Sequence, residues 1–98
     1  MILEIANFTV AEGRELEYEA TIAEAYPLIA SIDGHISHEL KHCIEEPTKY
    51  VFLVYWDTLE AHTVGFRESE QYIEWSKRLR PFYSEPPFVF HYEVPTHG

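Results

Sequence analysis

The chain has 98 residues and a mass of 11.5 kDa, which predicts one domain spanning residues 1–98. Seven basic and 17 acidic residues give a net charge of −10, which argues against nucleic acid or an anionic membrane as a partner. An aromatic content of 15% excludes a mainly disordered chain, and there is no membrane-spanning apolar run and no signal-peptide pattern. The single cysteine, Cys43, forms no internal disulfide, so we expect a cytoplasmic protein.

The first part of the chain predicts a strand followed by a helix. Residues 2–10 alternate as a strand does, and a helix begins near residue 14. Helical spacing predicts a buried stripe made of Leu16, Ala20, Ala23, Tyr26 and Ala30. We expect Pro27 to kink or interrupt this helix, and Asp33-Gly34 to end it.

Two strands follow the helix. Residues 35–44 alternate with period two, so His38 and His42 share a face while His35 points away from them. Residues 50–56 are apolar on both faces, which is typical of a strand that is covered on both sides.

The last part of the chain predicts two short helices and a final strand. Asp57, with Glu60 three residues later, resembles a capping box for a helix that ends near Phe66. A second helix covers residues 70–79 and stops at Pro81, and residues 88–94 form a strand with one aromatic face.

These elements assemble most simply into an α+β fold. The order strand-helix-strand-strand-helix-strand predicts a four-stranded antiparallel sheet of the ferredoxin-like type, with the helices on one face. Large apolar residues also occupy the other face, and the helices are too few to cover it. We therefore expect a homodimer that packs through this sheet face.

Residues 50–62 read YVFLVYWDTLEAH, and this segment resembles the central signature of the antibiotic biosynthesis monooxygenase (ABM) family. Gly34 and the stretch 66–72 fit the same family. The resemblance implies a dimeric α/β barrel with a pocket between the sheet and the helices of each subunit. It also implies relatives that oxidise anthrones or quinols with dioxygen, without metal or flavin, and another branch that degrades haem.

Three residues are candidates for catalysis. His62 lies six residues after Trp56, where anthrone-oxidising relatives carry a tyrosine, and imidazole accepts a proton near neutral pH. The alternative is a histidine that lies on the helix surface or packs against the sheet. The indole N–H of Trp56 is a potential donor to a substrate oxygen, although core packing is an equal reading. Asn7 resembles the asparagine that haem-degrading relatives carry on this strand, and otherwise bonds to backbone.

Further aromatic and histidine side chains are candidates for substrate binding: His38, Phe66, Tyr72, Trp75, Phe82, Tyr83 and His91. The aromatic ones are equally well explained as core. His38 and His42 are ~13 Å apart along a strand, so we expect no metal site.

The sequence departs from both characterised branches. Aligned on Trp56, the tryptophan and histidine of the haem branch fall at Gly65 and Trp75, so we expect no haem. The asparagine that the anthrone branch carries four residues before its tryptophan is Phe52 here.

Four of the seven basic residues lie close together in the chain: Arg67, Lys77, Arg78 and Arg80. Such a cluster attracts an anionic substrate, but we favour a solvated helix face paired with Glu68, Glu70 and Glu74.

The sequence therefore predicts a homodimeric, cofactor-independent monooxygenase that oxidises a small planar phenolic, quinol or polyketide-like aromatic substrate with dioxygen. His62 would act as base or proton relay. A non-catalytic dimer that binds a small aromatic ligand, or an isomerase or decarboxylase on the same scaffold, are the alternatives.

Overall fold

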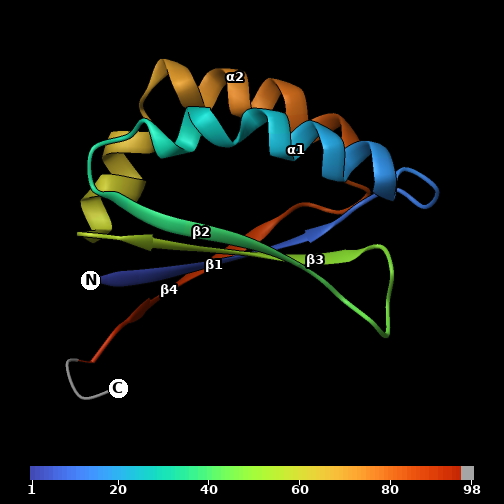
Figure 1. Cartoon of the computed structure of the whole chain (residues 1–98), viewed down its shortest axis with the longest axis horizontal. Coiled ribbons are helices and arrows are strands. Elements are labelled where there is room, and N and C mark those ends of the chain that lie inside the picture. Colours follow the sequence, from blue (N-terminus) through green and yellow to red (C-terminus); the bar gives the residue numbers. More distant parts are fainter. Residues whose placement is uncertain (96–98) are drawn as a thin grey trace.

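The computed structural model describes residues 1–95 as one sheet covered by helices on one side (Figure 1). The strands are antiparallel and lie in the order β2-β3-β1-β4. Their bounds are β1 Ile2–Thr9, β2 His35–His42, β3 Lys49–Trp56 and β4 Phe88–Glu93. This arrangement confirms the predicted α+β fold, in which two apolar strands form the centre of the sheet.

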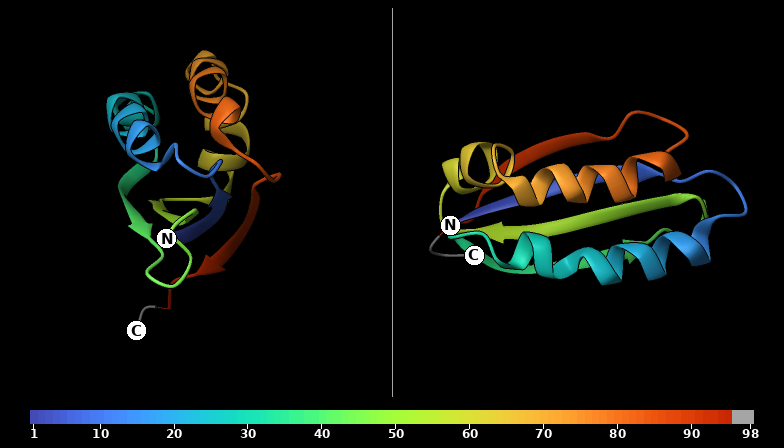
Figure 2. Two further views of the ribbon diagram at one scale, coloured as in Figure 1. Left: turned by 90° about the vertical axis from the view of Figure 1, so that its right-hand side faces the viewer. Right: turned by 90° about the horizontal axis from the view of Figure 1, so that it is seen from above.

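Two helices run side by side over the same face of the sheet (Figure 2). They are α1 (Glu15–Ala30) and α2 (Glu70–Leu79). Ser69 caps the start of α2, because its hydroxyl accepts the Tyr72 N–H at 3.1 Å. A π-helical turn, η1 (Ala61–Phe66), precedes α2, and a 3₁₀ turn, η2 (Arg80–Phe82), follows it. Within residues 1–95, no helix is long and apolar enough to cross a bilayer.

The predicted buried stripe of α1 was wrong. Leu16 is 84% exposed, whereas the buried side chains are those of Tyr18, Ile22, Ala25 and Ile29. Both sets have helical spacing and lie on opposite sides of the helix, so spacing alone did not select the face. The larger side chains face the sheet because burying them removes more apolar surface from water.

Pro27 does not interrupt α1, contrary to the expectation. It lies in the last turn with its ring exposed, and its carbonyl accepts the N–H of Ser31 at 3.1 Å. The helix therefore continues through Pro27 for three further residues although the carbonyl of Ala23 lacks its usual N–H partner.

The expected capping box at Asp57 was also wrong. The hydroxyl of Thr58, one residue later, accepts the N–H of Ala61 at 3.1 Å. The turn that begins there, η1, ends at Phe66 as predicted, and it carries His62 toward the sheet.

The β2 strand contains an irregularity between His35 and Ser37. It reverses the expected orientation of His35, whose Nε2 lies 2.9 Å from Nδ1 of His38 on the helix-covered face. A bulge adds one residue to the alternation, which is why simple period-two counting placed His35 on the wrong side.

The face of the sheet away from the helices is apolar and open. Register places Ile5 between Leu53 and Phe90, and Leu3 between Tyr55 and Tyr92. Phe88, Phe90 and Tyr92 are each about half exposed. The described chain therefore has one buried apolar layer under the helices and a second one without a cover.

Gly34 joins α1 to β2 at a position that only glycine fits. Its φ is +93°, and a Cβ built there would lie 2.6 Å from Cβ of Ala61. Its carbonyl accepts the Asp57 N–H at 2.7 Å, which ties this turn to the end of β3. The close approach fixes the start of η1, and with it the position of His62.

We predict that Gly34→Ala lowers the free energy of unfolding by about 2–4 kcal/mol, because it combines left-handed strain with a steric clash. Gly13→Ala is the matched control: Gly13 also has a positive φ (+88°), but nothing lies within 4 Å of its Cβ position. Gly13→Ala should lower the free energy of unfolding by only about 1 kcal/mol. In a double-mutant cycle measured by urea unfolding, adding Ala61→Gly to Gly34→Ala should restore the part of the unfolding free energy that the steric clash removes. Equal losses for Gly34→Ala and Gly13→Ala would contradict this account.

Candidate active site

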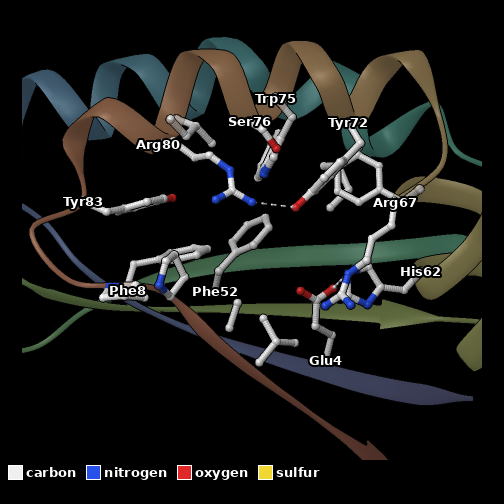
Figure 3. A pocket seen from close by; sticks show the side chains of 17 residues that line it. Glu4, Phe8, Phe52, His62, Arg67, Tyr72, Trp75, Ser76, Arg80 and Tyr83 are labelled. Carbon is white, nitrogen blue, oxygen red and sulfur yellow. Dashed lines mark hydrogen bonds and ion pairs between the residues drawn. The ribbon is translucent and has the colours of Figure 1, made fainter.

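A cavity of about 390 Å³ lies between the helix-covered face of the sheet and the segment from η1 to β4 (Figure 3). Most of its wall is apolar: Ala6, Phe8, Ile29, Phe52, Phe66, Trp75, Leu79, Pro86, Pro87 and Val89. A smaller polar set lines the rest: Glu4, His62, Arg67, Tyr72, Ser76, Arg80 and Tyr83. An apolar pocket with a few converging polar groups is typical of a site for a small organic molecule.

A buried carboxylate marks one end of the cavity. Glu4 on β1 is only 5% exposed, and its Oε1 accepts the indole N–H of Trp56 at 2.9 Å. The same oxygen lies 3.4 Å from Nε2 of His62, which is itself 3% exposed. Nδ1 of His62 lies 2.7 Å from Nε2 of His91 on β4, the residue directly opposite Glu4 in the sheet register.

Burial changes the proton affinity of both groups. It raises the pKa of the Glu4 carboxyl from 4.5 to about 7, against the opposing effects of the Trp56 hydrogen bond and the Arg67 charge. It lowers the pKa of His62 from 6.5 to about 3, an effect that the charge of Arg67 and neighbouring His91 reinforces. Glu4 is therefore the better base of the two near neutral pH, and His62 is a neutral imidazole.

The two histidines link Glu4 to a less buried position. With its proton on Nε2, a neutral His62 lies 3.4 Å from the Glu4 carboxylate without forming a hydrogen bond to it, and it accepts from His91 at Nδ1. Glu4, His62 and His91 therefore form a row of neighbouring titratable groups that leads away from the cavity.

Positive charge borders the cavity on the helix side. Arg67 follows η1, and its charge acts on Glu4, His62 and His91. Arg80 follows α2, and its Nη2 donates to the Tyr72 hydroxyl at 3.4 Å, as the dashed line in Figure 3 marks.

An aromatic wall closes the cavity at the end away from Glu4 (Figure 3). Tyr83 stacks on Phe8 with centroids 4.8 Å apart, and its hydroxyl lies 3.0 Å from that of Tyr18. Phe52 and Trp75 stack at 5.6 Å across the middle. These ring pairs give the cavity an aromatic wall against which an aromatic guest can pack.

Five predicted site residues line the cavity, namely His62, Phe66, Tyr72, Trp75 and Tyr83. His91 does not line it but contacts His62. Trp56 lies behind the wall and acts on the cavity through Glu4.

Three predicted residues lie elsewhere. Asn7 is on the open face of the sheet, opposite Val51 and Phe88, because it is one residue out of phase with Glu4 and Ala6. His38 packs against Tyr26 and bonds to His35. Phe82 packs against Tyr18 in the core, under the guanidinium of Arg14.

Sequence reasoning missed Glu4. The available signal was its place in β1, where it is the one charged residue on a face otherwise formed by Ile2, Ala6, Phe8 and Val10. A lone carboxylate among apolar residues is buried only with partners, and those partners come from distant segments. Among residues 1–95, no group of three or more His, Cys, Asp or Glu side chains is placed to hold a metal ion.

We predict that Glu4→Gln changes the pH dependence of stability. A carboxyl whose pKa is raised on folding stabilises the native state less as pH rises from 4.5 to about 7. The variant lacks this loss, so its free energy of unfolding relative to the native sequence should rise by about 3 kcal/mol over that interval and then level off. Urea unfolding between pH 4 and 8 measures this difference in unfolding free energy, with Glu12→Gln at an exposed position as the control. A difference that does not change with pH would contradict the raised pKa of Glu4.

Comparisons with known proteins agree with this architecture. The family model for antibiotic biosynthesis monooxygenase matches residues 1–78. The protein YczJ of Bacillus subtilis (strain 168) is 44% identical over 93 residues, which cover 95% of this chain and 98% of YczJ.

Solved structures show the same fold. A Bordetella bronchiseptica protein named for the antibiotic biosynthesis monooxygenases is 38% identical, with a TM-score of 0.92 over 96% of both chains. The cofactor-independent oxygenase SnoaB from Streptomyces nogalater is 19% identical, with a TM-score of 0.78 over 97% of this chain and 95% of its own, and this likeness concerns the fold alone. From the family match and the similarity in sequence and structure, the chain belongs to the antibiotic biosynthesis monooxygenase family.

Proposed function

We propose that this protein is a cofactor-independent monooxygenase that oxidises a small planar phenolic, quinol or polyketide-like aromatic compound with dioxygen. The observation that carries the proposal is the Glu4–His62 pair at the end of an aromatic cavity. An electron-rich aromatic reacts with dioxygen without a cofactor once it has lost a proton, because its anion is a sufficient reductant. The description of SnoaB as a cofactor-independent oxygenase on the same fold is consistent with this chemistry.

In the proposed mechanism, Glu4 removes the proton. Its two protein contacts both involve Oε1, which leaves Oε2 for a substrate hydroxyl. Arg67 stabilises the resulting anion, and the His62–His91 pair carries the proton away from the cavity. Glu4 thereby takes the role of base that sequence analysis gave to His62, and His62 takes that of relay.

The overall reaction balances with dioxygen as the one co-substrate. The anion gives its electrons to dioxygen and forms a carbon–oxygen bond; the oxygen–oxygen bond then breaks. One oxygen atom stays on the substrate as a carbonyl, and the other leaves as water with the two hydrogens that the substrate loses. One dioxygen is consumed for each product formed, and no hydrogen peroxide accumulates.

A homodimer through the open sheet face forms part of the proposal. The face presents large apolar side chains on β1, β3 and β4, and large exposed apolar surfaces are typical of protein interfaces. A second copy related by a two-fold axis would cover it with the same surface. The partner would also enclose Asn7, which lies on this face.

For activity, we predict that oxygen uptake with a panel of anthrones and naphthoquinols exceeds autoxidation, and that kcat/KM rises with pH through about 7 as Glu4 ionises. Glu4→Gln should lower kcat on the order of 100-fold or more, and His62→Gln should lower it less. Glu12→Gln, on the exposed surface, is the control.

Other outcomes would identify the alternatives. Full turnover by both Glu4→Gln and His62→Gln would remove these groups from the mechanism. Ligand binding without oxygen consumption would indicate a non-catalytic binding protein. Turnover under argon would indicate isomerisation or decarboxylation, for which the same relay would serve.

For assembly, we predict that the native chain sediments at twice its mass at micromolar concentration. Ile5→Glu and Phe90→Glu place a charge on two facing residues of the open face and should yield monomers, because burying unpaired charge is costly. Leu16→Glu changes an exposed apolar residue on α1, outside this face, and should leave the dimer intact. A monomeric native chain would contradict the interface.

A further inference from the structure

Two exposed arginines that line the cavity, like Lys77 outside it, have no carboxylate partner among residues 1–95. The chain carries 17 acidic and seven basic residues, so most basic side chains are expected to find a carboxylate. Four of them do, in the ion pairs Arg14–Glu17, Lys41–Glu39, Lys49–Glu46 and Arg78–Glu74. Among residues 1–95, no carboxylate lies within 4.0 Å of the guanidinium of Arg67 or Arg80, and both residues line the cavity.

The arrangement corrects the interpretation of the basic cluster. Only Arg78 pairs with an acid on the solvated face of α2, as the sequence analysis favoured. Arg80, two residues later, lies past the end of α2 and contributes to the cavity instead. Figure 3 shows its guanidinium between Tyr72 and Tyr83, away from the Glu4 end.

The surroundings of Tyr72 indicate a positive field at this position. Burial alone would raise the pKa of its hydroxyl, but the hydrogen-bonding neighbours Ser76 and Arg80 and the charges of Arg80 and Arg67 together lower it below its ordinary value. A site that favours the anionic form of a phenol favours other anions too. The charge of Arg67 is partly matched by ionised Glu4, whereas that of Arg80 has no such counterpart.

We infer that the substrate carries a carboxylate, which binds Arg80 and the Tyr72 hydroxyl at one end of the cavity while the reacting hydroxyl lies at Glu4. This inference rests on the proposed function and narrows its substrate class to hydroxylated aromatic acids. The ring would lie against Phe52 and Trp75, between the two polar ends. In a chain with a net charge of −10, Arg80 and Arg67 also supply the local attraction that such an anion needs.

The first test compares two probes of nearly equal shape by isothermal titration calorimetry, 2-naphthoate and the neutral 2-naphthamide. The native protein should bind 2-naphthoate more tightly than 2-naphthamide. Raising NaCl from 50 to 500 mM should weaken the binding of 2-naphthoate and leave that of 2-naphthamide unchanged. Arg80→Gln should weaken 2-naphthoate binding roughly three- to tenfold and leave 2-naphthamide unchanged. The affinity of Arg80→Lys for 2-naphthoate should lie between those of the native protein and Arg80→Gln, because lysine keeps the charge but lacks the planar guanidinium.

The matched control is Arg78→Gln, which removes the same charge two residues earlier in the chain but outside the cavity. It should leave both affinities within twofold of the native values. Equal affinity for the two probes, no binding of 2-naphthoate at millimolar concentration, or equal effects of Arg78→Gln and Arg80→Gln would each overturn the inference.

Oxygen uptake separates this inference from the proposed function. Tight, Arg80-dependent binding of 2-naphthoate with no oxidation of any quinol would refute the oxygenase and leave the carboxylate site standing. Oxidation of naphthoquinols that is unaffected by a ring carboxylate and by Arg80→Gln would support the oxygenase and refute the carboxylate site.

Discussion

The hydrogen bond between the Trp56 indole and the Glu4 carboxylate is the interaction on which the candidate site depends. A carboxylate that is 5% exposed remains in an apolar layer only if polar groups surround it. Trp56 supplies a donor from the end of β3, and η1 and β4 bring His62 and His91 to the same place. Four segments of the chain therefore meet at one ionisable group, and the fold positions each of them.

This arrangement lowers the stability of the folded protein. Burial that raises the pKa of Glu4 and lowers that of His62 also destabilises the charged forms of both groups in the folded protein. An apolar residue at position 4 would avoid that penalty but would leave the buried Trp56 indole N–H without its acceptor. A buried group with a perturbed pKa, facing a cavity, is a common feature of catalytic sites.

Both faces of the sheet carry apolar side chains, but in the described chain only one face is covered by helices. On one face, α1 and α2 cover the strands, and a space of about 390 Å³ remains between the sheet, η1 and α2 (Figure 3). On the other, Leu3, Ile5 and the aromatic residues of β4 have no cover within the described chain. In the proposed homodimer, a second copy of the chain would cover this face.

The sequence by itself determined the order of elements, the sheet and the family, because the period-two and apolar patterns of residues 2–10 and 50–56 are local properties. It also identified His62, through the resemblance that surrounds Trp56. Tertiary structure alone decided which face of α1 is buried, that Glu4 meets His62 and His91, and that Arg80 rather than Arg78 borders the cavity. The physical reason is that strand and helix periods arise between near neighbours, whereas the site forms between side chains 29 to 58 positions apart, whose contacts only packing creates.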